Sequence, residues 1–461
     1  MKYLCGIATM VIAAMVPLSL EAASLKPGDL ITPDNATAVA DFVSPGNYYL
    51  VKQGMRLKIV PTERLEWPPP YKAATEKYSA QVGLNDQGEL QNYVAGQPFP
   101  LLDPNDPQVA TKVMWNFSYR PQYTDDVDIR DVEIVSWRPN SLPPGPVEHF
   151  TIGHFAFYNN IGRTEVQPIP TDSEATGAGI RYRFGEFPFF EPTELRGFGL
   201  VRLCSKDPRK DDDAWYYNPL GRRLRNVSAQ SLSDQMGPFG MGGGGGGSSG
   251  GINGFAPPVV SPGGSSSTAY ADNLDPDSYF GFSAKIENYD YKFLGIKPML
   301  ASVHAQNTPA TPCRLDDNRS VCPETWEIRQ LYVIEATAKP LSWHQKIGIS
   351  GVLIPKRVLY IDSEGWFITA SDQYDVQGRL WKTIATFNAY ADRPVADAKV
   401  AIYPFKRMFQ IALVDEDIQS GFSSVLYMPG HQSADYESWY INMGIVTKAF
   451  LDPHQMQNFA R

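Results

Sequence analysis

The stretch His149–Tyr158, HFTIGHFAFY, indicates the class of fold. It is rich in aromatic and β-branched residues, and its first half alternates polar and apolar side chains, which is typical of a β-strand. Similar strand-like runs lie on both sides of it, over Asp128–Trp137, Ile180–Phe184 and Gly197–Lys206. Because short turns separate these runs, we expect an antiparallel meander rather than a fold of alternating strands and helices.

The strand pattern continues through most of the chain. A hairpin is predicted over Ala214–Arg225, with its turn at Asn218–Gly221 (NPLG). Further strands are predicted over Asp290–His304, Thr325–Lys339, Val358–Ile361, Gly365–Gln373, Arg379–Tyr390, Lys399–Tyr403 and Phe409–Leu413. The sequence therefore predicts a mainly β (α+β) protein built on a curved antiparallel sheet.

Helical patterns are confined to the two ends of the chain. The predicted helices are Asn35–Val43 (with Asp34 as N-cap), Ala73–Val82, Gln108–Phe117 and Tyr436–Phe450. The segment Tyr48–Val60 fits a helix or a strand, and the sequence leaves this choice open. Pro68, Pro69 and Pro70 are expected to separate it from the helix that follows.

Composition limits the class of protein. The chain has 461 residues, of which 43% are hydrophobic and 20% charged, so it can bury a sizeable core. It carries 41 Lys+Arg against 50 Asp+Glu, a net charge of -9, which argues against a nucleic-acid partner. Six consecutive glycines, Gly242–Gly247, predict a disordered insertion at about residues 237–268 within a single domain spanning residues 24–461.

The first 23 residues have the pattern of a secretory signal peptide. Lys2 precedes an apolar run, Leu4–Leu20, and the small residues Ala22, Ala23 and Ser24 follow it. We therefore expect cleavage near Ala23 and a periplasmic location, with peripheral association with the outer membrane as a further possibility. The alternative interpretation of the same residues is an uncleaved membrane anchor.

The cysteines fit an oxidising compartment. Cys313 and Cys322 flank the polar segment RLDDNRSV, and we expect a disulfide bond between them. A metal site there is a weaker interpretation, because no His or further Cys lies nearby in the sequence. Cys204 lies in a strand-like run and is expected to be a buried thiol rather than a nucleophile.

Motifs of hydrolases and metal sites are absent from the sequence. There is no GxSxG or HExxH, and His149 and His154 are five residues apart in a strand, which would place them on opposite faces of a sheet. We therefore expect no catalytic residue, no metal site and no cofactor.

Acidic clusters have two interpretations each. The cluster Asp125–Asp131 could bind calcium, but Asp is also common in turns, which is the favoured interpretation. Asp211–Asp213 is predicted to pair with the arginines of the hairpin, Arg222, Arg223 and Arg225, and an anionic head group is the alternative partner of those arginines. Asp372–Tyr374 is predicted to form an Asp-initiated turn, with a polar lip of a cavity as the alternative.

Seven segments, in order, resemble one bacterial family. They are WPPPYKAATEKYSAQV (Trp67–Val82), GQPFP (Gly96–Pro100), ELRGFG (Glu194–Gly199), DDDAWYYNPLGRRLRNVS (Asp211–Ser228), DSYFGFSAKIENYDYKFLGIKPML (Asp277–Leu300), WEIRQLYVIEAT (Trp326–Thr337) and RVLYIDSEGWFITASDQYDVQGRLWK (Arg357–Lys382). Over nearly the whole mature chain, the sequence is similar to the bacterial domain-of-unknown-function family 1329, whose members are often labelled as outer-membrane lipoprotein-sorting-like. It departs from the family at the glycine tract and at Trp343–Pro355, which looks longer than the usual turn.

The resemblance implies a fold similar to LolA and LolB, in which a half-barrel sheet surrounds helices and an apolar cavity. Aromatic residues would then line the cavity, although such stripes are more often simply core. The candidates are Tyr182, Phe184, Phe187, Trp215, Tyr217, Tyr332, Trp366 and Trp381. The expected function is the non-catalytic binding or ferrying of a lipid, a lipoprotein acyl chain or a similar apolar small molecule.

Two other functions stay open at this point. The chain could be a structural or accessory component of an envelope or exporter complex without a ligand of its own, or, less in keeping with the motifs, a hydrolase. The resemblance also implies as partners an inner-membrane exporter of the resistance-nodulation-division type or an outer-membrane protein.

Overall fold

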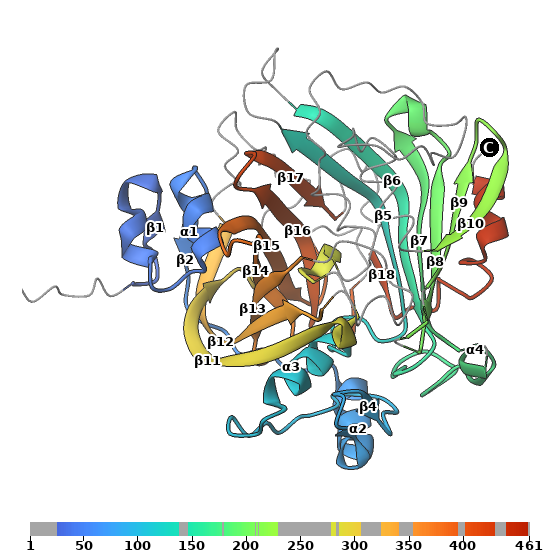
Figure 1. Ribbon diagram of the computed structural model, residues 1–461, viewed down its shortest axis with the longest axis horizontal. Helices are drawn as coiled ribbons and strands as arrows, with labels where there is room; N and C mark the ends of the chain where they lie inside the picture. Colours follow the sequence, from blue (N-terminus) through green and yellow to red (C-terminus); the bar gives the residue numbers. More distant parts are fainter. Residues whose placement is uncertain are drawn as a thin grey trace, which may run out of the picture.

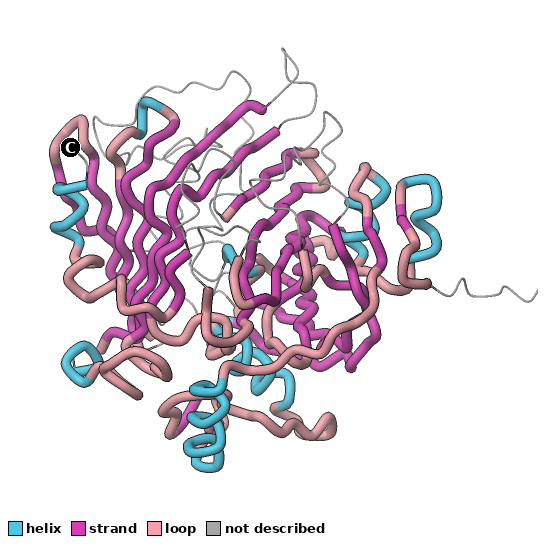
Figure 2. Tube along the Cα trace, turned by 180° about the vertical axis from the view of Figure 1, so that it is seen from behind, coloured by secondary structure: helices cyan, strands magenta, loops and turns pink. Residues whose placement is uncertain are grey.

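A computed structural model describes residues 25–137, 146–177, 179–207, 209–210, 212–228, 278–282, 285–305, 324–340, 354–394, 402–428 and 439–459. The predicted signal peptide, the glycine-rich insertion and the Cys313–Cys322 pair lie outside these residues. Within them, most strands belong to one large sheet of 16 strands, which is curved and does not close on itself (Figures 1 and 2). The protein is therefore mainly β, as the sequence predicts.

Two antiparallel meanders make up most of the sheet. The first contains β5 (Asp126–Trp137), β6 (Pro146–Asn159), β7 (Ile180–Glu191), β8 (Gly199–Ser205), β9 (Asp213–Asn218) and β10 (Arg223–Ser228). The second contains β12 (Glu324–Ala338), β13 (Lys356–Asp362), β14 (Ile368–Tyr374), β15 (Leu380–Ala391), β16 (Arg407–Asp417) and β17 (Phe422–Tyr427). The predicted hairpin is confirmed, because Arg223 pairs with Asn218 across its turn.

The two meanders meet where β17 pairs with β5. Val425 lies opposite Val135, and the hydroxyl oxygens of Ser136 and Ser424 are 2.8 Å apart although the residues are 288 positions apart in the sequence. This seam makes one continuous sheet from two stretches that are each local in sequence.

The sheet is not purely antiparallel, which corrects the prediction. β2 (Leu57–Ile59) runs parallel to the start of β12 and pairs on its other edge with β1 (Leu30–Ile31). β11 (Tyr289–Ala301) pairs antiparallel with β12, opposite β13. Leu57 lies opposite Glu324 in this parallel pair, so the pairing joins distant parts of the sequence and no short-range pattern reveals it.

The N-terminal helices differ in detail from the prediction. The first is a 3-10 helix, η1 (Pro33–Val39), and its N-cap is Thr32 rather than Asp34. The ambiguous segment divides into α1 (Pro45–Lys52), capped by Ser44, and the strand β2. The prolines begin α2 (Pro69–Tyr78) rather than only separating it, since proline is well tolerated in the first turn.

The α-helices lie beside and below the sheet (Figure 1), whereas the 3-10 helix η5 (Ser278–Phe280) packs on one of its faces. The predicted helix at residues 108–117 is confirmed as α3 (Val109–Ser118), below the sheet, while α1 packs against β14 and β15. The expected wrapping of the sheet around helices is not confirmed. None of the described helices is long and apolar enough to cross a bilayer.

The predicted C-terminal helix over Tyr436–Phe450 is wrong for its described part. Trp439–Ile441 forms β18, which pairs with Val127–Ile129 of β5 beyond the end of β17, and turns follow it. Helical structure occurs only later, in η7 (Pro453–Gln455) and α8 (Met456–Phe459). The unpaired edge of β5 offers backbone hydrogen bonds that outweigh the local helical preference. In the predicted strand Lys399–Tyr403, the described residues Ile402 and Tyr403 are loop.

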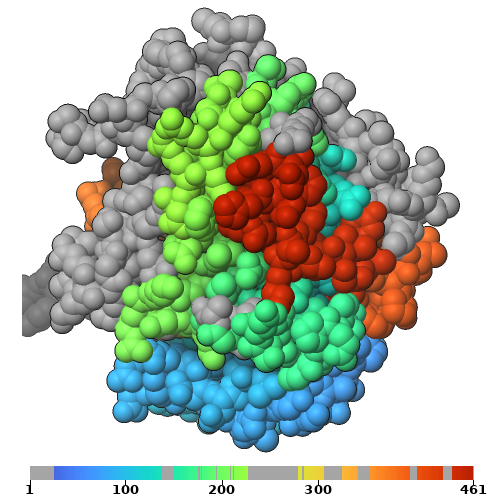
Figure 3. Space-filling view, turned by 90° about the vertical axis from the view of Figure 1, so that its right-hand side faces the viewer, coloured from blue at the N-terminus to red at the C-terminus, as the bar shows by residue number. Residues whose placement is uncertain are grey.

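Both faces of the first meander are covered. On one face, Phe155 and Phe184 pack against Tyr279 of η5 (Ser278–Phe280). On the other face, Phe187 and Tyr217 pack in a cluster with Leu451 and Met456 of the C-terminal segment. Figure 3 shows this segment, in red, lying across the green strands of the meander.

Candidate ligand-binding site

A cleft of about 520 Å³ lies between α3 and the strands β7 and β8. We call it the outer cleft; its volume is within the range of small-molecule sites. Its third side comes from β4 (Leu90–Gln91) and η6 (Ile286–Asn288). Its aromatic wall consists of Tyr93, Trp115, Phe117, Tyr119, Tyr182 and Phe282.

The aromatic wall is assembled from elements far apart in the sequence. The rings of Tyr93 and Tyr119 are 3.9 Å apart between centroids, and Phe117 meets Phe282 edge to face at 6.4 Å. Tyr182, on β7, is the half-buried aromatic of the sheet that reaches this wall. Such a wall can bind apolar or planar groups by burial and ring stacking.

Arg181 joins the sheet to α3. Its Nη2 donates a hydrogen bond to Ser118 Oγ at 2.5 Å. Its guanidinium also lies over the ring of Tyr119, 4.6 Å from the centroid, and 5.6 Å from that of Tyr182. These contacts orient a planar, permanently charged group within the aromatic wall.

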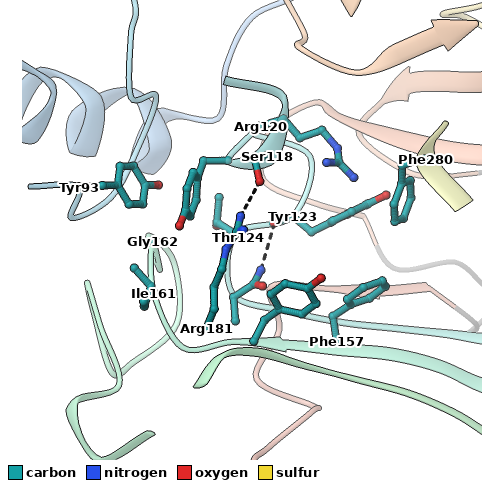
Figure 4. Close-up of a pocket in the computed structure, with 13 residues that line it drawn as sticks. Tyr93, Ser118, Arg120, Tyr123, Thr124, Phe157, Ile161, Gly162, Arg181 and Phe280 are labelled. Atoms are coloured by element: carbon teal, nitrogen blue, oxygen red, sulfur yellow. Dashed lines mark hydrogen bonds between the residues drawn. The ribbon is translucent and has the colours of Figure 1, made fainter. Parts of the chain in front are cut away.

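A smaller pocket of about 60 Å³ adjoins the outer cleft (Figure 4). We call it the inner pocket. Six residues line both: Tyr93, Ser118, Tyr119, Ile161, Arg181 and Tyr182. The further lining residues of the inner pocket are Arg120, Tyr123, Thr124, Phe157, Asn159, Gly162 and Phe280. Arg120 is buried there, with its guanidinium 4.5 Å from the ring of Phe117 and 4.6 Å from that of Phe280.

The outer cleft also carries acidic groups. Asp212 pairs with Arg202 at 2.8 Å and with Lys285 at 3.1 Å. Burial opposes ionisation of Asp212, but these two cations outweigh it and hold its pKa below the usual value. Burial raises the pKa of Glu287, which Arg181 and Lys285 partly offset. The cleft is therefore amphipathic, with an aromatic wall and a charged rim.

The eight predicted ligand-binding residues do not share one place. Tyr182 lies in the cleft, whereas Phe184 is fully buried against Tyr279. Phe187, Trp215 and Tyr217 belong to the opposite face, under the C-terminal segment. In the second meander, Tyr332 stacks on Trp366 at 5.3 Å, and Trp381 Nε1 donates to Asp417 Oδ2 at 3.2 Å.

Sequence reasoning missed most of the cleft. Tyr93, Trp115, Tyr119 and Arg181 were not among the predicted site residues, although Arg181 belongs to the strand-like IRYRF run. An arginine within an aromatic strand is the one local signal that could have pointed to this site. The positions of Tyr93 and Trp115 depend on the docking of α3, which the sequence does not reveal.

The acidic clusters serve structural roles. Asp125 accepts backbone N–H bonds from Thr164 and Glu165, both at 2.7 Å, and Asp128 pairs with Arg130 and His154. No cluster of three or more metal-ligating side chains occurs among the described residues.

Two predicted roles of acidic residues need correction. The pairing of Asp211–Asp213 with the hairpin arginines is wrong for Asp212, whose partners are Arg202 and Lys285. Asp372 forms neither a turn nor a lip: it is buried and accepts from Ser44 Oγ, Gly46 N and Thr383 Oγ1, so it holds the start of α1 on the sheet. The turn carboxylate is Asp375, which accepts from the backbone of Gln377 and Arg379. The prediction placed the turn carboxylate three residues too early. Asp372 instead accepts hydrogen bonds from the N-terminal end of α1, which is distant in the sequence.

These features define a β-sheet protein with an amphipathic cleft at one end of an open, curved sheet. The chain belongs to the family described as protein of unknown function (DUF1329), whose model matches residues 30–244 and 264–425. This confirms the resemblance read from the seven sequence segments. No curated protein matches the chain.

Solved structures give weaker likenesses. A domain titled as an outer membrane lipoprotein-sorting protein from Vibrio parahaemolyticus is 13% identical, with a TM-score of 0.40, over 75% of this chain and 97% of its own. A DUF1329 family protein from Desulfovibrio piger has the same identity and TM-score over 75% and 96%. A LolA superfamily protein from Nitrosomonas europaea is 15% identical, with a TM-score of 0.29, over 67% and 84%.

Proposed function

We propose that this chain is a periplasmic, non-catalytic protein that binds an apolar or amphipathic small molecule, such as a lipid, in the outer cleft. The observation behind the proposal is the aromatic wall, which gathers six rings from α3, β7 and three connecting segments around one volume of about 520 Å³. Burial of apolar ligand surface against such a wall would supply most of the binding free energy.

The placement of titratable groups supports binding rather than catalysis. Glu186, whose pKa burial raises to about 8, lies in the closed core against Tyr279 and not in the cleft. His149 and His154 are held by Glu133 and Asp128, at 2.8 and 3.0 Å, and neither histidine lines the cleft. The acidic groups that do line the cleft include Asp212, which is held by Arg202 and Lys285. A hydrolase would need an acid and a base free to act beside a bound substrate.

One observation favours the second candidate, an accessory protein without a ligand. The sheet face at Phe155 and Phe184 is filled by Tyr279 and Phe280 from the same chain, so that part of the sheet offers a ligand no room. If the protein is a carrier, the ligand therefore occupies the outer cleft beside α3 and not the sheet face at Phe155 and Phe184. An exporter of the resistance-nodulation-division type or an outer-membrane protein would deliver or receive it.

Native mass spectrometry of gently purified protein, followed by titration with an environment-sensitive apolar dye, tests the proposal. We expect co-purified lipid and roughly one-to-one dye binding with a negative heat-capacity change, which marks apolar burial. Tyr182→Ala should weaken binding, whereas Tyr374→Ala, a half-buried tyrosine on β14 away from the cleft, should not. Absence of saturable binding by folded wild-type protein, across several lipid classes, would refute the carrier function.

A further inference from the structure

The inner pocket has a charge unlike that of the whole protein. The chain has a net charge of -9, yet two guanidinium groups, Arg120 and Arg181, line the inner pocket. None of the described residues that line it is an aspartate or glutamate. A positive, partly enclosed pocket in an acidic protein attracts a negative group, and its low-polarity walls strengthen that attraction.

The size of the inner pocket limits what can enter. Its volume of about 60 Å³ is roughly twice the share of one water molecule in the liquid. A compact end group such as a carboxylate or phosphate monoester suits so small a space better than the long body of an acyl chain. The outer cleft is almost nine times larger, shares six lining residues with the inner pocket, and can take the body of the ligand.

Arg181 is the positively charged residue that lines both the outer cleft and the inner pocket. Its contact with Ser118 Oγ and its stacking on Tyr119 orient the guanidinium, and a guanidinium fork matches the geometry of a carboxylate or phosphate. Arg120, buried between Phe117 and Phe280, donates to Gln122 Oε1 at 2.9 Å and adds a second positive charge at the wall. Figure 4 shows the two arginines on different sides of the pocket.

We propose that the ligand of this protein is an anionic amphiphile, whose single acid group enters the inner pocket and pairs with Arg181 while its apolar body lies along the aromatic wall of the outer cleft. This inference rests on the proposed binding function and specifies its ligand class. Glu287, on the rim of the outer cleft, is within electrostatic reach of Arg181 and competes with the acid group of the ligand for this cation.

Calorimetric titration near neutral pH with dodecanoic acid, dodecanol and methyl dodecanoate tests the ligand class. The three probes share a chain and differ in charge at one end. We expect the acid to bind about tenfold or more tightly than the alcohol or ester, as a charge-assisted hydrogen bond implies. Dodecyl phosphate, as a fourth probe, shows whether carboxylate or phosphate is preferred. Equal binding of acid, alcohol and ester would overturn the inference and leave the proposed function intact, whereas no binding of any probe would refute both.

Three variants locate the acid group. Arg181→Gln should weaken binding of the acid about tenfold more than it weakens binding of dodecanol, and so remove the preference for the acid. Arg196→Gln, which removes an exposed arginine of the β7–β8 turn, should keep the full preference. Glu287→Gln should strengthen binding of the acid alone, because it removes a competing negative charge. Retention of the acid preference by a folded Arg181→Gln protein would place the acid group elsewhere and contradict the inference. If Arg181→Gln does not fold, the inference is tested by the probe series on wild-type protein and on Glu287→Gln. A wild-type protein without acid preference, or a Glu287→Gln protein without stronger acid binding, would then contradict it.

Discussion

The phenol of Tyr279 donates a hydrogen bond to the carboxyl group of Glu186, and both side chains are only 2% exposed. Tyr279 belongs to the short segment that packs on the sheet, and Gln410 of β16 donates to its carbonyl oxygen. This contact fastens the segment to strands of both meanders. Burial raises the pKa of Glu186 to about 8, so the carboxyl group is mostly protonated at neutral pH and the core holds little net charge there.

Glu186 should make the protein less stable as pH rises. The unfolded chain releases this proton near pH 4.5, whereas the folded protein keeps it until about pH 8, so the folded state binds more protons between these values. The free energy of unfolding should therefore fall across this window, by an amount on the order of 5 kcal/mol at most. Urea unfolding at several pH values measures it.

The variant Glu186→Gln should lose this pH dependence, because it has no proton to release. Measurements above pH 6 separate the effect from that of Asp372, whose pKa burial raises to about 6. Glu174→Gln, at a side chain that is 88% exposed, serves as the control and should behave like wild type. An unchanged slope in Glu186→Gln would show that this carboxyl group titrates normally.

Gly46→Ala should destabilise the protein by at least about 2 kcal/mol. A Cβ atom at Gly46 would lie 2.0 Å from Thr383 Oγ1 and 2.3 Å from Asp372 Oδ1. The start of α1 would therefore have to move away from β14 and β15, against which it packs. Gly83→Ala is a matched control, since its Cβ would meet no atom within 4 Å, and should change stability by less than about 0.5 kcal/mol. Equal unfolding midpoints for the two variants would contradict the packing of α1.

Phe184→Asp should unfold the protein rather than only abolish ligand binding. Phe184 is fully buried between Phe155, Phe157 and Tyr279, so the variant would bury a charge without a partner. Phe190→Asp, six positions further along β7 at a side chain that is 42% exposed, should keep the fold. Circular dichroism checks both variants; a folded Phe184→Asp protein without dye binding would instead place Phe184 in an open cavity.

Peptide mapping without reduction should recover one linked pair of peptides, containing Cys313 and Cys322. The reason is their short separation in a polar segment of a chain predicted to be exported. Cys204 is only 2% exposed in β8, so exchange with it would require local unfolding. A link between Cys204 and either of the other two would refute the prediction.

The mature chain should begin near Ala23, Ser24 or Leu25 in the periplasmic fraction. N-terminal sequencing of protein from that fraction is the measurement. An intact Met1 in the membrane pellet would instead support the alternative interpretation, an uncleaved anchor.

Local pattern predicted the meanders well, because each strand pairs with its neighbour in sequence. The alternation around Phe155 and Phe157 and the turn at Asn218–Gly221 were sufficient for this. Features that depend on distant partners were not predictable: β18 exists because β5 has an open edge, and Asp372 serves α1 rather than its own turn. The outer cleft also depends on distant partners, because Arg181 of β7 contacts Tyr119 only when α3 packs beside the sheet.

The seam between β5 and β17 bears on the order of folding. Each meander can form from hairpins between neighbouring strands, but the seam must bring together residues 288 positions apart, and closing so long a loop is slow. During synthesis from the N-terminus, β5 exists long before β17 and has an exposed edge for that time. Such an edge can pair with other chains and cause aggregation. Export in an unfolded state, or binding by a chaperone, would prevent this until β17 pairs with β5.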